Sequence, residues 1–302
     1  MKKNWTTRLM AGIAAGTMVF SLAGCGSSSD GKKSADKEKF IVGFDAAFPP
    51  YGYQDENGEY VGFDLDLAAE VCKRNDWELV KQPIDWNAKD MELNSGTISC
   101  IWNGFTMNGR EDEYAWTDPY VDNSQVFVVK ADSGIATFAD LAGKSVAVQT
   151  DSSAEAALKE DDNKELKDSF KELVVVSDYN TAFMNLDSGA ADAIAVDIGV
   201  AKYQLSQREE GKYIILDEPI QSEQYGIGFK KGNDDLKDTV WAEVLKLYDA
   251  GEVDKLAEKY EVADMLCIGD EDAEKEDAAE DETADDASEE KADDTAEETK
   301  AN

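Results

Sequence analysis

The chain has 302 residues, of which 66 are acidic, 30 are basic and none is histidine, so its formal net charge is -36. Nothing in it resembles a basic stripe that would release counterions from phosphates, which argues against a nucleic-acid-binding protein. The absence of histidine excludes Ser-His-Asp triads, histidine metal ligands and the commonest general base near neutral pH.

The N-terminus has the features of a secretory signal. Basic residues at positions 2, 3 and 8 precede an apolar run that ends near Leu22 and is short for a membrane span. The segment Leu-Ala-Gly before Cys25 resembles the lipobox of bacterial lipoproteins. That resemblance implies a signal peptide over residues 1–24, and acyl chains such as palmitate on Cys25 would hold the mature protein on the outer face of the cytoplasmic membrane. A plain transmembrane anchor is the alternative.

Two further segments lie outside the predicted fold. Residues 25–39 have the Ser, Gly and Lys content of a flexible linker, and residues 269–302 form an acidic segment without large apolar residues, which predicts a disordered tail. About 230 residues remain, enough for one large or two modest domains. Cys72, Cys100 and Cys267 allow at most one disulfide, and we interpret them as small buried side chains and not as metal ligands.

Between these segments the predicted elements alternate between strands and helices. A strand at 39–44 and a hairpin-type turn at 55–58 precede a helix for which Asp64 is the expected N-cap, with Asp66 in its first turn. The pattern then predicts strands near 77–80, 97–101, 145–148, 173–176 and 193–196, and helices near 90–94, 138–141, 153, 181–186, 234–250 and 253–260. Such alternation indicates crossover connections and mostly parallel sheets.

Two long extended passages, near 120–129 and 213–229, separate the βα units into two groups. We therefore expect two α/β lobes with a cleft between them.

Four sequence blocks carry a resemblance to a known family. They are GFDLDL at 62–67, GFT at 104–106 with Arg110 and WTDPY at 116–120, DAIAVD at 192–197, and YGIG at 225–228 with Gly251-Glu252. In this order they resemble the extracellular solute-binding proteins of polar amino acid ABC importers, over roughly residues 40–260. The resemblance implies an α/β, type II periplasmic-binding-protein fold, in which two mostly parallel sheets flanked by helices are joined by a two-stranded hinge. Lobe 1 would comprise residues 40–127 and 222–268, and lobe 2 residues 128–221.

The chemistry of a free amino acid fits two of these residues. A zwitterion needs a cation for its α-carboxylate and an anion for its α-ammonium, and arginine can pair both carboxylate oxygens at once. By resemblance Arg110 takes the carboxylate, helped by Thr106 and the backbone near Gly104, and Asp197 accepts from the ammonium. A surface pair of Arg110 with an adjacent glutamate, and a helix N-cap role for Asp197, are the alternatives.

The same resemblance nominates further ligand-binding residues. Ser152 and Ser153 would help to bind the carboxylate, Phe48 and Trp86 would sandwich the side chain, and Asp45 would contact the amine or the side chain. Asn103 and Gln149, with Trp102, are candidates for side-chain selectivity. Two departures from the family pattern stand out: one residue fewer separates Thr106 from Arg110, and Asp151 replaces a glycine. No catalytic residue, metal ligand or cofactor is expected.

The sequence therefore predicts a lipid-anchored, monomeric binding component that closes on a polar L-amino acid and delivers it to an ABC permease. Closure would use hinge segments near 125–129 and 220–225. One alternative is a dehydratase-type enzyme on the same fold, acting on an arogenate- or prephenate-like substrate, with Asp45 or Asp151 as general acid. A ligand-sensing surface receptor is the other.

Overall fold

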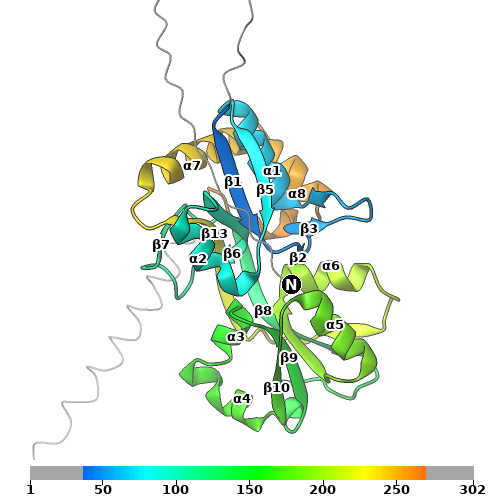
Figure 1. Ribbon diagram of the computed structural model, residues 1–302. Helices are drawn as coiled ribbons and strands as arrows, with labels where there is room; N and C mark the ends of the chain where they lie inside the picture. The colour runs from blue at the N-terminus through cyan, green and yellow to red at the C-terminus, as the bar shows by residue number, and fades with distance from the viewer. Residues whose placement is uncertain (1–36, 270–302) are drawn as a thin grey trace, which may run out of the picture. The chain divides into compact units, whose positions relative to one another are not determined.

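The computed structural model describes residues 37–269 (Figure 1). The signal peptide, Cys25, the linker before residue 37 and the acidic tail from residue 270 lie outside the described residues. Within residues 37–269, no helix has the length and apolar character needed to cross a bilayer.

Ten strands form one hydrogen-bonded sheet. Across the sheet they run β10 (Glu172–Val176), β9 (Ser145–Gln149), β11 (Ala193–Asp197), β8 (Val121–Lys130), β13 (Gln221–Lys230), β6 (Cys100–Thr106), β1 (Lys39–Phe44) and β5 (Glu78–Pro83), with β12 (Tyr213–Ile215) paired to β8 and β7 (Tyr114–Trp116) paired to β13. Strands β5, β1 and β6 are parallel to one another, as are β10, β9 and β11. The expected alternation of strands and crossover helices is thus confirmed.

The two long strands β8 and β13 join the parallel groups. They pair with each other in antiparallel register, from Gln221 opposite Gln125 to Tyr225 opposite Val121. Strand β8 is also antiparallel to β11, and β13 to β6. The fold is therefore the expected two-lobed α/β arrangement of the type II periplasmic-binding-protein class, and its two-stranded hinge makes the two parallel sheets continuous.

We call the group around β5, β1 and β6 the first lobe and the group around β10, β9 and β11 the second lobe. The first lobe carries helices α1 (Phe63–Arg74), α2 (Lys89–Ser95), α7 (Asp234–Asp249) and α8 (Glu252–Lys259), and a small antiparallel sheet of β2 (Ala47–Phe48), β3 (Gly52–Gln54) and β4 (Tyr60–Val61). The second lobe carries α3 (Ser153–Ala157), α4 (Lys164–Ser169), α5 (Tyr179–Ser188) and α6 (Ile198–Ser206). Short 3₁₀ turns η1 to η4 span Trp86–Ala88, Phe138–Leu141, Asp161–Asn163 and Ala263–Met265.

Helix α1 shows how sequence pattern becomes packing. Phe63, Leu67 and Val71 recur at intervals of four residues, are fully buried, and belong to a core that includes residues of α7 and α8. Asp66 lies in the first turn, as expected, and accepts hydrogen bonds from Lys259 Nζ (2.7 Å) and Tyr260 Oη (2.6 Å). These bonds connect α1 to the end of α8.

The structure corrects the expected N-cap of α1. The N-cap is Gly62, and Asp64 lies inside the first turn, where it is fully buried. Gly62 has φ +144°, and a Cβ there would come within 2.1 Å of the Tyr51 carbonyl oxygen, so only glycine fits. Asp64 Oδ2 accepts from the Gly104 N–H instead (2.6 Å).

The start of one strand and the presence of one helix also differ from the sequence prediction. The strand expected at 97–101 begins only at Cys100, because α2 ends in a left-handed turn at Gly96 that leads into a loop. Helix α6, which starts directly after Asp197, was not predicted, since its mostly apolar residues show little amphipathic contrast. This helix places Asp197 at a strand-to-helix junction.

Candidate functional site

Polar residues gather where the central strands of both lobes end. Strand β6 ends at Thr106, β9 at Gln149 and β11 at Asp197, while Asp45 follows the last residue of β1. Open α/β sheets bind ligands outside the carboxyl ends of their strands. The topology therefore brings side chains that are far apart in sequence to one edge between the lobes.

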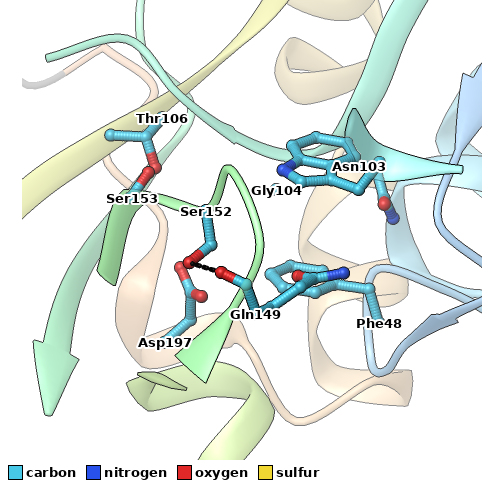
Figure 2. Close-up of a pocket in the computed structure, with 9 residues that line it drawn as sticks. Phe48, Asn103, Gly104, Thr106, Gln149, Ser152, Ser153 and Asp197 are labelled. Atoms are coloured by element: carbon cyan, nitrogen blue, oxygen red, sulfur yellow. Dashed lines mark hydrogen bonds between the residues drawn. The ribbon is translucent and has the colours of Figure 1, made fainter. Parts of the chain in front are cut away.

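A pocket lies at this edge, with a volume of about 270 Å³ including its mouth. The first lobe contributes five lining residues and the second lobe four, drawn in Figure 2: Phe48, Trp86, Asn103, Gly104 and Thr106 from the first, and Gln149, Ser152, Ser153 and Asp197 from the second. All nine had been nominated from the sequence.

Arg110 lies beside this pocket without lining it. Its guanidinium Nη1 donates to the Thr106 carbonyl oxygen (3.1 Å) and to Ser153 Oγ (3.2 Å), so it bridges the two lobes. The neighbouring Glu111 accepts from the Gly109 N–H (2.9 Å). Arg110 is thus directed at two residues that line the pocket, and the alternative of a surface pair has no hydrogen bond to support it.

Asp197 is 4% exposed and lines the pocket from the second lobe. Its Oδ1 accepts from Gln125 Nε2 (2.7 Å), Asn123 Nδ2 (2.9 Å) and Tyr225 Oη (2.6 Å). Burial raises the pKa of this carboxyl, although the three donors oppose that effect. Asp197 occupies the N-cap position of α6, but its side chain makes no capping hydrogen bond. The capping alternative therefore does not account for its carboxylate.

Glu223, on hinge strand β13, is a buried acid that the sequence analysis missed. Its Oε1 accepts from Thr106 Oγ1 (2.8 Å), Asn123 Nδ2 (2.7 Å) and Gln125 Nε2 (2.7 Å). Burial, followed by the charge of Asp197, raises the pKa of Glu223 to about 7. In the sequence it is one acid among many, and only strand pairing brings it next to Asp197.

Asp45 does not line the pocket but supports a residue that does. Its Oδ1 accepts from the Ala47 N–H (2.8 Å) and its Oδ2 from Gln149 Nε2 (2.6 Å), which is a hydrogen bond between the lobes. Burial raises the pKa of Asp45. Gln149 Nε2 also donates to the Ser177 carbonyl oxygen (3.1 Å), so its amide is held from two sides.

The aromatic residues lie in a packed environment. The Phe48 ring is 5.9 Å from the Tyr51 ring and 5.9 Å from the Tyr179 ring, and the Trp86 ring packs edge-on against Phe105 at 5.4 Å. Such contacts hold their faces in place and exclude water from nearby polar groups.

Ser152 and Ser153 differ in how their hydroxyls are used. Ser152 is the N-cap of α3, and its hydroxyl accepts from the Glu155 N–H (3.1 Å) and donates to the Gln149 carbonyl oxygen (2.8 Å; Figure 2). The Ser153 hydroxyl instead faces Arg110. Ser152 is therefore committed to local structure to a degree that the sequence pattern did not reveal.

Two of the selectivity candidates, Trp102 and Asn103, lie in different surroundings. Trp102 is fully buried in the main core and does not line the pocket, so no contact in the structure supports its nomination. Asn103 lines the pocket, and its Oδ1 accepts from the Asp45 N–H (2.8 Å). Its amide thereby fixes the end of β1.

Gly104 lets the backbone of the pocket wall pack closely against three aromatic rings. Its φ is +55°, and a Cβ there would meet the Tyr225, Phe48 and Tyr51 rings at 2.9, 3.0 and 3.1 Å. The bond from its N–H to Asp64 holds this backbone turn in place. Within residues 37–269, no group of three or more Cys, Asp and Glu residues is arranged to hold a metal ion.

Comparison with known proteins places this chain in a family. The model of the bacterial extracellular solute-binding proteins, family 3, matches residues 40–263. The chain belongs to this family. Among similar proteins, the arginine-binding extracellular protein ArtP of Bacillus subtilis (strain 168) is 30% identical over 268 residues, covering 85% of this chain and 98% of that protein.

Two solved structures are also similar. An ABC uptake transporter substrate-binding protein from Streptococcus pneumoniae with bound histidine has a TM-score of 0.70 and 32% identity, over 74% of this chain and 92% of that one. An ancestral amino acid-binding protein, described as a precursor of cyclohexadienyl dehydratase, has a TM-score of 0.67 and 29% identity, over 74% of this chain and 95% of that one.

Proposed function

We propose that this solute-binding protein captures a free polar L-amino acid between its two lobes and delivers it to an ABC permease. The observation that carries the proposal is the convergence of Asp197 and Arg110 on one pocket: Asp197 lines it, and Arg110 contacts the lining residues Thr106 and Ser153. A zwitterion between them meets an acid for its ammonium and a guanidinium for its carboxylate.

The lobes would close around the ligand by bending at β8 and β13. The first lobe would then move as one body that comprises residues 40–127 and 222–268, and the second lobe as one that comprises residues 128–221. Hydrogen bonds of Gln149 with Asp45 and of Arg110 with Ser153 join the lobes, and separation of the lobes would break both. A ligand that touches both lobes gains the differential affinity that closure requires.

Delivery requires that the protein stay close to the membrane. We propose that Cys25 is acylated after signal cleavage and anchors a monomer on the outer face of the cytoplasmic membrane. Labelling of cells with an alkyne-tagged palmitate, with Cys25→Ser as the control, tests this step: the variant should lose the label and appear in the medium.

Binding is favoured over catalysis by the positions of the candidate acids. Asp45 and Asp151 were the proposed general acids of a dehydratase, yet neither lines the pocket, and their carboxylates are paired with Gln149 and Lys89. The similar proteins ArtP and the Streptococcus pneumoniae protein are both described as binding proteins. A ligand-sensing receptor would have the same pocket and differ in its partner.

Calorimetry of the mature protein against the twenty standard L-amino acids and L-cystine tests the function. We expect at least one to bind with a Kd well below millimolar, and Arg110→Ala to weaken that binding by at least about 30-fold, since it removes a charged hydrogen-bonding group. Failure of every amino acid to bind at millimolar concentration would refute the proposal. Incubation with prephenate or arogenate, followed by analysis for aromatic product, tests the enzymatic alternative.

A further inference from the structure

Asp197 belongs to a cluster of buried polar side chains at the hinge, which we call the hinge cluster. It consists of Thr106, Asn123, Gln125, Asp197, Glu223 and Tyr225, none of them more than 4% exposed. Strand pairing sets its geometry, because Glu223 lies opposite Asn123 and Tyr225 opposite Thr106. The cluster is therefore built by β6, β8, β11 and β13 together.

Two amide groups connect the two carboxylates of this cluster. Asn123 Nδ2 donates to Asp197 Oδ1 (2.9 Å) and to Glu223 Oε1 (2.7 Å). Gln125 Nε2 also donates to both carboxylates, at 2.7 Å to Asp197 Oδ1 and 2.7 Å to Glu223 Oε1. Because an amide nitrogen carries two hydrogens, these four bonds use every hydrogen that the two amides have.

The side chains of the hinge cluster supply fewer hydrogen-bond donors than its buried acceptor atoms need. Three buried acceptors have no hydrogen-bond donor: Glu223 Oε2, Asn123 Oδ1 and Gln125 Oε1. One added proton on a carboxylate would supply one donor and remove one of two adjacent buried charges. Carboxylates that share a site commonly hold a proton between them for this reason.

The groups that face Glu223 from neighbouring elements do not neutralise it. Tyr51, Tyr179 and Tyr225 are uncharged near neutral pH, because a phenol has an ordinary pKa of about 10 and burial raises it further. Arg110 contacts the same residue from its other side: its Nη1 donates to the Thr106 carbonyl oxygen, whereas the Thr106 hydroxyl donates to Glu223. Among the described residues, no ion pair joins Arg110 to Glu223. A buried Glu223 carboxylate beside the Asp197 carboxylate agrees with a pKa of Glu223 that is raised to about 7.

We propose that Asp197 and Glu223 share one proton in the unliganded protein, and that the ammonium of the incoming ligand displaces it. Glu223 is then a positioning residue, which acts on the ligand through Asp197. The inference rests on the proposed function, because it requires an ammonium at Asp197. The ligand supplies a positive charge and three donors, so the proton leaves for the buffer and both carboxylates are ionised in the complex.

The sign of the pH dependence follows. A nearby cation lowers the pKa of Glu223 in the complex below its value of about 7 in the free protein. The complex therefore binds fewer protons than the free protein at slightly acid pH. Affinity rises as pH rises through about 7, and binding releases up to one proton.

Calorimetry in phosphate and in imidazole, two buffers that titrate in this pH range and differ in ionisation enthalpy, measures that proton directly. The probe is the tightest-binding standard L-amino acid whose own groups do not titrate between about pH 5.5 and 8. For the wild-type protein we expect release of about 0.5–1 proton near pH 6.5, and affinity about tenfold weaker near pH 5.5 than near pH 7.5, by linkage. Binding without proton release would overturn this inference and leave the proposed function standing; absence of binding would overturn both.

Glu223→Gln identifies the source of the proton. The variant keeps the shape and stays neutral, so it should release no proton and bind equally well at both pH values, with the affinity of the wild type near pH 5.5. Glu218→Gln, at an exposed position just before β13, is the matched control and should behave as the wild type. Unchanged proton release in Glu223→Gln would contradict the assignment, and if this variant does not fold, the wild-type proton count decides.

Discussion

The Lys89 ammonium forms an ion pair with the Asp151 carboxylate, and this pair connects α2 of the first lobe with the turn after β9 in the second lobe. The Lys89 side chain is only 3% exposed, whereas that of Asp151 is 52% exposed. The ammonium also lies 5.3 Å from the centre of the Trp86 ring, which lines the pocket. Asp151, noted in the sequence as a replacement for glycine, thus directs its charge at a cation and not at the ligand site.

This ion pair should favour the closed cleft, because Lys89 has no buried partner when the lobes separate. We expect Asp151→Asn to weaken amino acid binding by about 1 kcal/mol, or roughly fivefold, with little change in the melting temperature of the unliganded protein. A double-mutant cycle with Lys89→Gln, measured by calorimetry, isolates the pair energy. Strictly additive losses in the two single variants would show that the pair does not couple the lobes.

Arg110 should require its planar fork as well as its charge. We expect Arg110→Lys to reduce affinity for the bound amino acid by about 1.5–3 kcal/mol, or about 10- to 100-fold, because lysine cannot pair two carboxylate oxygens. Arg208→Lys is the matched control, since Arg208 packs over the Phe183 ring and donates to Gln204 outside the pocket. Equal binding by the two lysine variants would argue against carboxylate recognition by Arg110.

Gly104 should be far less tolerant of substitution than Gly109. We expect Gly104→Ala to lower the free energy of unfolding by about 2–4 kcal/mol, because the added methyl group meets three aromatic rings at a positive φ. Gly109 has φ +75°, and no atom lies within 4 Å of the position that an added methyl group would take, so Gly109→Ala should cost only about 1 kcal/mol of backbone strain. Urea denaturation measures both, and similar losses would mean that packing at Gly104 adds nothing.

Asp64 should make the protein less stable as pH rises from about 4 to about 7. Burial raises its pKa in the folded state to about 7, whereas an unfolded aspartate titrates near 3.8. Between these values the folded chain holds a proton that the unfolded chain has lost, so stability declines by about 1.4 kcal/mol for each pH unit at most. Asp64→Asn removes this dependence, and the variant should gain stability relative to the wild type over this interval.

Asp140 gives a control of opposite sign for that measurement. The N–H groups of Ala136 and Thr137 lower the pKa of its carboxyl, so its contribution to stability is present near neutral pH and is lost on acidification. Asp140→Asn should therefore lose stability relative to the wild type at neutral pH but not in strong acid. Thermal denaturation across pH separates the two curves, and a flat difference curve for Asp64→Asn would disprove a raised pKa at that residue.

Local patterns in the sequence were enough to predict most strands and helices. The apolar run at 193–196 and the helical spacing in 63–74 correspond to β11 and α1. The errors came where tertiary contacts outweigh local preference: Asp64 has the chemistry of an N-cap, but burial against Gly104 and the glycine at position 62 put it inside the helix.

The candidate site followed a similar division. Nine of the twelve residues nominated for the ligand site line one pocket, and Trp102 lies in the core. Several of the nine lie at or just after the carboxyl ends of β6, β9 and β11, where open α/β sheets bind ligands. Asp45 and Arg110 lie one contact away. Glu223 escaped notice because an acid on an extended strand has no local signal.

Family membership, most strands and helices, and the candidate residues of the site could be predicted from the sequence, because these depend on local periodicity and on motifs along the chain. Tertiary contacts were needed to show which acids are buried together and which charges pair across the cleft. Asp197 and Glu223 are 26 residues apart in the chain, and they share donors because β8 pairs with β11 on one side and with β13 on the other. The energy of a charge depends on its surroundings, and those are set by residues distant in sequence.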